Sequence, residues 1–259
     1  MTTNGPLILG SAGHVGRALA RVWPKDQPAF WHSRKGGDLA WDLLTESAPD
    51  LTGITGVVQL ARGADAAAEV ALACAACDLG DVYGVPVLIA SSQAVYGPQL
   101  GKVGEDTPCQ PVGDYGAGKL AMEQAITGRA CALRIGNVAG CDMLLMNAAK
   151  GRVTLDQLPD GSSPRRSYIS AVGLGAVIRG LLAHAGPLPD VVNVAQPGTL
   201  AMGDLLRAAC QSWDWRPAGP GVLATLELDV TRLMALVPLP QVDAQVLIAE
   251  ARAAGWAVR

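Results

Sequence analysis

The chain has 259 residues, of which half are hydrophobic and 17% are charged, so it can bury a sizeable core as one large α/β unit, with at most a small appendage. Its formal net charge of −3 gives no reason to expect nucleic acid or an anionic membrane as a partner. No apolar run reaches the ~18 residues of a membrane span, and the N-terminus lacks a signal-peptide pattern, so we expect a cytoplasmic protein.

Short apolar segments alternate with helical patterns through the first half of the chain. The first helical pattern, 14–23, ends at Pro24, and a Pro/Gly-rich loop is expected over 99–113. We expect strands at 6–10, 28–32, 39–43, 56–61, 85–92 and 131–137, and helices at 14–23, at 64–79 and from 113 onward. This alternation predicts a doubly wound parallel sheet with helices on both faces, the Rossmann type of α/β fold.

After Gly140 the alternation gives way to loops and helices. We expect a loop at 156–167, a short strand at 191–195, and helices at 201–210 and 245–255. The pattern predicts a dinucleotide-binding domain over 1–140, to which segments near 166–195 return. A small, discontinuous substrate lobe would comprise 141–165 and 196–259.

Two of the six cysteines, Cys74 and Cys77, have the spacing of a redox or zinc pair. No second pair and no histidine cluster accompanies them, and they lie in the middle of a predicted helix. We therefore interpret them as core residues and predict no metal site.

Three glycines follow the first predicted strand and open the first helix, in the segment LILGSAGHVGRAL. Gly10, Gly13 and Gly16 allow a tight turn and a close approach of the backbone to a pyrophosphate, which then lies at the helix N-terminus. A glycine triplet in this context favours dinucleotide binding over an ordinary glycine-rich turn.

A tyrosine and a lysine four residues apart, Tyr115 and Lys119, occur in the segment GDYGAGKLAMEQAI. On a helix they lie on one face, where the ammonium group favours the phenolate form of a tyrosine and so promotes proton transfer. Such a pair is more often a solvated helix face, so its context matters. Ser91 and Ser92 supply that context, because they end the strand 85–92, and ligands bind at the carboxyl ends of parallel strands.

Together these segments resemble the extended short-chain dehydrogenase/reductase family, whose members include NAD(P)-dependent epimerases, dehydratases and reductases. The resemblance rests on the glycine spacing, then SSQAVYG, then YGAGK, in that order. It extends over nearly the whole chain through VVQLA, LRIGNVAG, RRSYISAVGLGAVI and VVNVAQPGTLAMGDLL.

The resemblance implies catalytic roles for Ser92, Tyr115 and Lys119. Lys119 would hold the nicotinamide ribose, Tyr115 would exchange a proton with the substrate oxygen, and Ser92 would orient that oxygen while hydride passes to or from the nicotinamide. The implied cofactor-binding residues are Gly10, Gly13, His14, Val15, Gly16, Ser33, Arg34, Lys35, Asp42, Leu43, Leu60, Ala61, Arg62, Tyr115, Lys119 and Asn137.

Departures from the family pattern narrow the reaction. Gln93 and Ala94 stand where family dehydratases carry acidic residues, which argues against dehydration by that route. Because the chain is short for the family, the substrate is either a sugar nucleotide or a smaller carbonyl compound. Arg165 and Arg166 are candidates for an anionic substrate group, whereas Arg134 suits that role and a buried structural role equally.

The alternative function is a non-catalytic dinucleotide-binding protein that senses redox state or regulates a partner. Family members of that kind tend to lose the tyrosine or the lysine, and both are present here. Catalysis is therefore favoured.

The position about 20 residues after the first glycine usually carries an acidic residue that binds the adenine ribose of NAD. Here Ser33, Arg34 and Lys35 occupy the segment, and a guanidinium suits a 2′-phosphate. We therefore predict NADP(H) over NAD(H), with Asp42 nearer the adenine edge. By resemblance, the helices at 64–79 and from 113 onward would form a homodimer interface.

Overall fold

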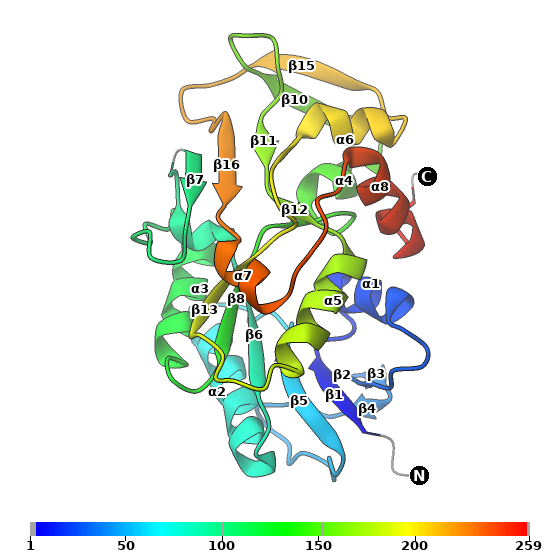
Figure 1. The fold of residues 1–259 in the computed structure, drawn as a ribbon, viewed down its shortest axis with the longest axis vertical. Helices are drawn as coiled ribbons and strands as arrows, with labels where there is room; N and C mark the ends of the chain where they lie inside the picture. The colour runs from blue at the N-terminus through cyan, green and yellow to red at the C-terminus, as the bar shows by residue number, and fades with distance from the viewer. Residues whose placement is uncertain (1–3, 100, 152, 258–259) are drawn as a thin grey trace.

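The computed structural model describes residues 4–99, 101–151 and 153–257. A seven-stranded sheet, with all strands parallel, forms its centre in the order β13-β8-β6-β5-β1-β2-β4 (Figure 1). The strands are β1 Gly5–Leu9, β2 Phe30–Ser33, β4 Leu39–Ala40, β5 Ile54–Gln59, β6 Val87–Ser92, β8 Cys131–Ile135 and β13 Val191–Val194. The doubly wound prediction is confirmed. The strand order reverses between β1 and β5, where such sheets bind ligands.

Two pairs of helices cover the two faces of this sheet (Figure 1). Helices α1 His14–Val22 and α5 Ala171–Leu182 pack together on one face, and α2 Ala66–Tyr83 and α3 Asp114–Ala125 pack on the other. Because side chains alternate along a strand, Ile8 packs toward α1 and α5, whereas Leu7 and Leu9 pack toward α2 and α3.

A second lobe has its own apolar core, which includes Leu145, Leu206 and Leu247. It contains α4 Met143–Ala148, α6 Met202–Ala208, α8 Ala244–Ala253, and the parallel pair β10 Val153–Gln157 and β15 Trp213–Pro217. The sequence did not indicate these two strands. Strand β10 ends inside the expected loop 156–167, and its alternation in VTLDQ is too short to stand out.

Short strands join the two parts. One sheet has the order β14-β11-β16-β7, and β9 pairs with β12. These strands and the remaining short elements are β3 Gly36–Gly37, η1 Gln93–Tyr96, β7 Gly101–Val103, β9 Asn137–Val138, β11 Arg165–Arg166, β12 Tyr168–Ile169, β14 Leu200–Ala201, β16 Thr225–Leu228 and α7 Thr231–Leu236. Strand β7 lies within the predicted loop 99–113.

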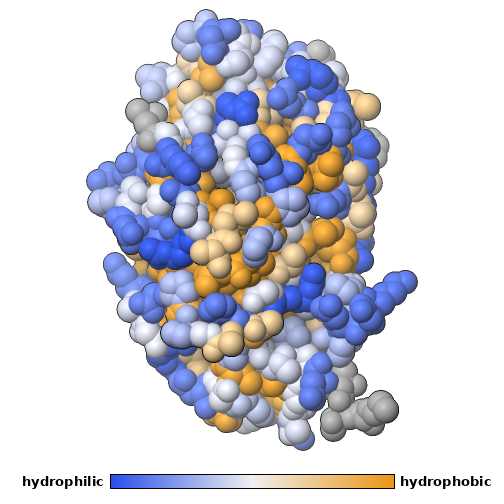
Figure 2. Space-filling view, in the orientation of Figure 1, coloured by the Kyte–Doolittle hydropathy of each residue, from blue (hydrophilic) through white to orange (hydrophobic). Residues whose placement is uncertain are grey.

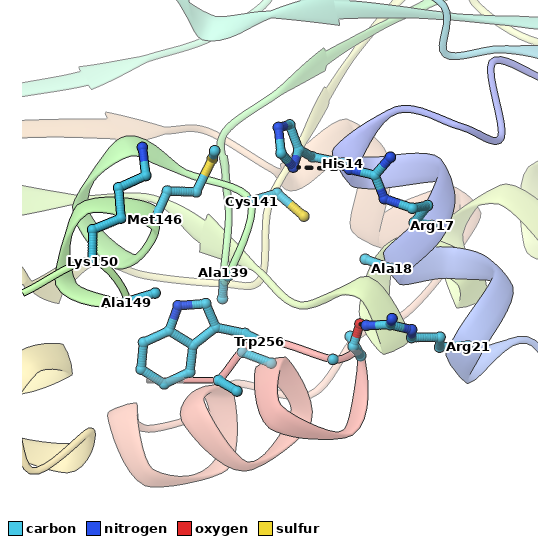
Figure 3. A pocket seen from close by; sticks show the side chains of 15 residues that line it. His14, Arg17, Ala18, Arg21, Ala139, Cys141, Met146, Ala149, Lys150 and Trp256 are labelled. Atoms are coloured by element: carbon cyan, nitrogen blue, oxygen red, sulfur yellow. Dashed lines mark hydrogen bonds between the residues drawn. The ribbon is translucent and has the colours of Figure 1, made fainter. Parts of the chain in front are cut away.

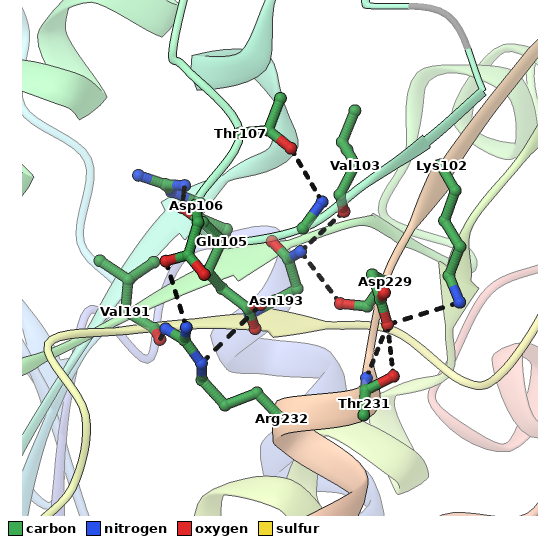
Figure 4. A network of polar contacts seen from close by, with 12 residues as sticks. Lys102, Val103, Glu105, Asp106, Thr107, Val191, Asn193, Asp229, Thr231 and Arg232 are labelled. Atoms are coloured by element: carbon green, nitrogen blue, oxygen red, sulfur yellow. Dashed lines mark hydrogen bonds and ion pairs between the residues drawn. The ribbon is translucent and has the colours of Figure 1, made fainter.

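A polar network ties β7 and β16 to the edge strand β13 (Figure 4). The Asn193 side chain donates to the carbonyls of Val103 and Asp229 at 3.1 Å each, and its backbone N–H donates to Glu105 at 2.9 Å. Lys102 pairs with Asp229 at 3.4 Å. Because a buried amide without partners is costly, Asn193 fixes this junction between the two parts.

Hydrophilic residues cover most of the face shown in Figure 2, while hydrophobic residues gather near its middle, around α7. None of the described helices is long and apolar enough to span a membrane.

Cys77 belongs to α2, and its side chain is buried in the core under that helix. Burial raises the pKa of the Cys77 thiol to about 11, so at neutral pH it behaves as a small apolar side chain.

Candidate active site

The glycine loop between β1 and α1 has the close packing that the sequence predicts. Gly10 has a φ of +87°, and a Cβ there would lie 2.5 Å from the backbone nitrogen of Ala61. A Cβ on Gly16 would lie 2.5 Å from the Gly10 carbonyl oxygen. No side chain caps the N-terminus of α1. The loop therefore fits a dinucleotide pyrophosphate, since the first N–H groups of the helix are available to an anion.

The predicted adenine-side residues lie beyond β2 and β4. The Ser33 hydroxyl donates to the Gly36 carbonyl at 2.8 Å, so it stabilises the turn itself. Arg34 and Lys35 are exposed, and neither has an ion pair among the described residues. Asp42 accepts from the backbone N–H of Leu44, and Leu43 packs against the core.

One cavity of about 650 Å³ brings together the three residues predicted to be catalytic. Ser92 reaches it from the end of β6, and Tyr115 and Lys119 reach it from the first turns of α3. Of the predicted cofactor-binding residues, Val15, Leu60, Arg62 and Asn137 also line it. The cavity therefore lies at the carboxyl ends of the central strands.

The Lys119 side chain is 7% exposed and is held by two acceptors. It forms a hydrogen-bonded ion pair with Glu69 of α2 and donates to the Ala90 carbonyl oxygen at 2.6 Å. The other Glu69 carboxylate oxygen accepts from the backbone N–H of Gly63 at 2.7 Å. An ammonium has three donors, so one N–H of Lys119 stays available for a ligand.

Glu69 is a site residue that the sequence did not indicate. It lies 50 positions before Lys119, and no local pattern joins the two. The available signal was a single carboxylate within an otherwise apolar stretch of helix, because a buried charge has to be paired.

Tyr115 is 43% exposed, and the guanidinium of Arg62 lies 4.8 Å from the centre of its ring. A cation over the face of an aromatic ring is attracted to it, and the attraction is stronger for a phenolate. Arg62 is therefore a second cation beside Tyr115, and it has no ion pair among the described residues.

Arg134, whose role the sequence left open, lies in the interior. It forms an ion pair with Glu123 of α3 at 2.8 Å and donates to the Tyr96 hydroxyl at 3.0 Å. Ser91 donates to the same Glu123 carboxylate, so Ser91 belongs to this buried network. Burial raises the pKa of Tyr96 to about 12. Arg134 thus has a structural role.

The far wall of the cavity is polar. Gln93 donates to the Asn137 side-chain oxygen at 3.2 Å, and Arg166 and Tyr168 line the cavity beside them. Burial lowers the pKa of Arg166, although a guanidinium remains charged at neutral pH. Arg165, in contrast, points to Thr199 on the surface.

Asp142 is a carboxylic acid in this wall that the sequence analysis did not single out. One oxygen caps α4 by accepting from the backbone N–H groups of Leu144 and Leu145, and the other is buried with no hydrogen-bond partner among the described residues. Burial raises the pKa of Asp142 to about 6, against the effect of the backbone hydrogen bonds. An Asp followed by the apolar run MLLMNA is the signal that predicts such a cap.

Comparison with known families shows which family the chain belongs to. A sequence model of the NAD dependent epimerase/dehydratase family matches residues 51–195, more than half of the chain. The chain therefore belongs to this family of enzymes, which is of the extended short-chain dehydrogenase/reductase type, as the motifs predicted. No curated protein matches the sequence significantly.

Solved structures of such enzymes share the fold. MoeE5 in complex with UDP-glucose and NAD is similar with a TM-score of 0.76 and 18% identity, over 96% of this chain and 98% of MoeE5. The NDP-hexosamine 5,6-dehydratase TunA gives a TM-score of 0.73 and 18% identity over 96% of this chain and 97% of TunA. UDP-glucuronic acid 4-epimerase from Bacillus cereus, in complex with UDP-glucuronic acid and NAD, gives 0.72 and 17% over 96% of this chain and 98% of that enzyme.

Proposed function

We propose that this protein transfers a hydride between NAD(P) and the hydroxyl-bearing or carbonyl carbon of a small substrate, as an epimerase or a reductase. The observation that carries the proposal is the shared cavity of Ser92, Tyr115 and Lys119 at the carboxyl ends of the central strands. We also propose the division into a dinucleotide-binding domain over 1–140, with 166–195 returning to it, and a smaller substrate lobe.

When bound, the nicotinamide accepts or supplies the hydride. Tyr115 exchanges a proton between its hydroxyl and the substrate oxygen, and Ser92 donates to that oxygen. Lys119, fixed by Glu69 and the Ala90 carbonyl, offers its remaining N–H to the cofactor ribose. Gln93 and Asn137 also line the cavity, with Gln93 available to substrate hydroxyls and Asn137 to the cofactor.

Two cations, Lys119 and Arg62, line the cavity with Tyr115, and they differ in whether a carboxylate pairs with them. Glu69 offsets much of the positive charge of Lys119, because the two side chains form a buried ion pair. Arg62 carries no such partner and lies over the tyrosine ring. Arg62 therefore contributes to the electrostatics of proton transfer at Tyr115.

We propose a sugar nucleotide as the substrate class, with a smaller carbonyl compound as the alternative. Solved relatives contain UDP-glucose or UDP-glucuronic acid. The wall of this cavity combines amide and carboxyl groups for hydroxyls with Arg166 for an anionic group.

Replacing Tyr115 with Phe tests the function. We expect turnover to fall by at least about 100-fold, since the proton-transferring hydroxyl is lost, while the cofactor dissociation constant changes little. Turnover is followed by cofactor absorbance or by product analysis across a panel of UDP-sugars and small carbonyl compounds. Tyr83→Phe, which removes a hydroxyl on α2 outside the cavity, is the matched control. Undiminished turnover in Tyr115→Phe would refute the mechanism.

For the cofactor we propose NADP(H) over NAD(H), although the named relatives contain NAD. The support is the exposed pair Arg34 and Lys35 at the end of β2, where an acid would repel a 2′-phosphate. Each charge-assisted hydrogen bond contributes about 1.5–3 kcal/mol, so Arg34→Ala should weaken NADP(H) binding about 10- to 100-fold and leave NAD(H) binding nearly unchanged. Equal affinities in both proteins would contradict the preference.

We further propose a homodimer through α2 and α3. Val82 of α2 is 76% exposed and Val112, just before α3, is 75% exposed. Light scattering at micromolar concentration should give the dimer mass, and a monomer mass would refute this.

A further inference from the structure

A second cavity, of about 660 Å³, shares Cys141 in its lining with the site described above (Figure 3). Its walls come from both parts of the molecule. Helix α1 forms one side, and the segment around α4 and the C-terminal end of α8 form the others. A ligand bound here would therefore contact the nucleotide-binding part and the smaller lobe together.

Positive charge lines this cavity from two sides. Arg17 and Arg21 lie one turn apart on α1, and Lys150 follows α4 across the cavity (Figure 3). None of the 15 described residues that line it is acidic. Three cations thus face one cavity in a protein whose net charge is −3.

These cations have no anionic partner among the described residues. Arg17 donates to the Ala12 carbonyl and lies 3.4 Å from the Nδ1 atom of His14, and Arg21 donates to the Ala254 carbonyl at 3.4 Å. The Lys150 ammonium has neither a hydrogen bond nor an ion pair within the described part of the chain. Like charges held around one space repel, and an anion placed between them relieves that repulsion.

The guanidinium and ammonium groups of this cavity favour a phosphate group as the ligand. Guanidinium groups bind phosphate oxygens through paired hydrogen bonds, and an ammonium adds a point charge. Trp256 and Met146 supply an apolar wall beside the cations, which suits the organic part of a phosphorylated molecule.

The cavity borders the proposed cofactor site, because His14, one of the predicted cofactor-binding residues, lines it, but the cavity extends beyond that site. Val15, within the glycine segment, lines the first cavity and not the second. Arg21 lies seven residues along α1 from His14, about 10 Å at 1.5 Å per residue. A pyrophosphate at the helix N-terminus does not extend that far along the side of the helix.

We propose that this cavity binds a small phosphate-bearing anion, with Arg17, Arg21 and Lys150 as its ligands. The anion bridges α1 to the lobe that contains α4 and α8, and so stabilises one arrangement of the two parts. The site functions whether or not the proposed hydride transfer is correct.

The test is calorimetric titration of the protein, both without cofactor and saturated with NAD(P), with inorganic phosphate, pyrophosphate and a hexose phosphate, at ionic strength matched with chloride. We expect binding, with Lys150→Ala and Arg21→Ala each weakening it about 10- to 100-fold. Lys25→Ala, an exposed lysine outside the cavity, is the matched control and should change nothing. Tighter binding of the hexose phosphate than of inorganic phosphate identifies an organic ligand, and the reverse identifies the free ion.

Three results would overturn the proposal. They are no binding beyond the chloride control, equal affinity in Lys150→Ala and Arg21→Ala compared with the wild type, or binding that disappears once the cofactor is saturating. The last result would assign the cations to the cofactor site. Because the readout is not turnover, failure of the hydride-transfer mechanism leaves this test intact.

Discussion

Two buried ion pairs of nearly equal exposure occupy neighbouring places beside the central sheet. In one, Glu69 and Lys119 are each 7% exposed, and in the other, Glu123 and Arg134 are 4% and 6% exposed. Arg134 directs its donors to Glu123, the Tyr96 hydroxyl and the Glu105 carbonyl, all in the interior. The Lys119 ammonium uses two of its three donors within the described protein, and it lines a cavity.

The difference shows that burial does not distinguish a structural pair from a functional one. What distinguishes them is the unused hydrogen-bonding capacity and where it lies. The Glu123–Arg134 pair is saturated by the protein, so its loss should appear as lost stability. We propose that a ligand accepts the remaining N–H of Lys119, so loss of the Glu69–Lys119 pair should appear in binding.

The largest effect is expected for Glu123→Gln. Removing the carboxylate leaves the Arg134 guanidinium buried without a counter-charge, which costs about 3–5 kcal/mol of unfolding free energy. Denaturant unfolding measures this loss. A loss below about 1 kcal/mol would mean that the interior pair is not the structural element described here.

Asp142 extends the comparison to a buried carboxyl group that has no ion pair with any described residue. Burial raises its pKa to about 6, above the usual 3.8, so the fold favours the protonated form. The resulting stabilisation is complete below about pH 4 and is lost as the pH rises through about 6. Asn also caps helices well, so Asp142→Asn keeps the cap of α4 and removes only the charge. The substitution should raise the free energy of unfolding above pH 6 by up to about 3 kcal/mol and leave it unchanged near pH 4. Unfolding free energies of both proteins across this range test it, and a constant difference between them would contradict it.

The smallest effect concerns Arg62 beside Tyr115. Arg62→Gln removes the cation over the tyrosine ring, an interaction that contributes about 0.5–1 kcal/mol at an exposed site. If the cation assists proton transfer, turnover should fall about 2- to 5-fold, which steady-state kinetics at saturating substrate measures. Unchanged turnover in Arg62→Gln would contradict the role of Arg62.

The sequence predicted the central fold well because each strand and helix carries its own local pattern. The glycine loop and the segment with Tyr115 and Lys119 also lie within single elements, so their placement beside one cavity follows from the parallel sheet. Glu69 could not be found this way, since its role depends on contacts with α3 and Gly63 that only the folded chain creates. Likewise, β10 and β15 have too few residues to show a period, and they exist because each pairs with the other.

We propose that Lys119 binds the cofactor, whereas Arg134 stabilises the fold. The most direct measurement is the NAD(P)H dissociation constant of the double variant Glu69→Gln/Lys119→Met, which removes both charges of the pair and leaves no buried ion unpaired. Compared with Glu69→Gln alone, we predict about 10- to 100-fold weaker binding, and we predict that Glu123→Gln binds the cofactor like the wild type at a temperature where it is folded. Wild-type affinity in the double variant would contradict the account.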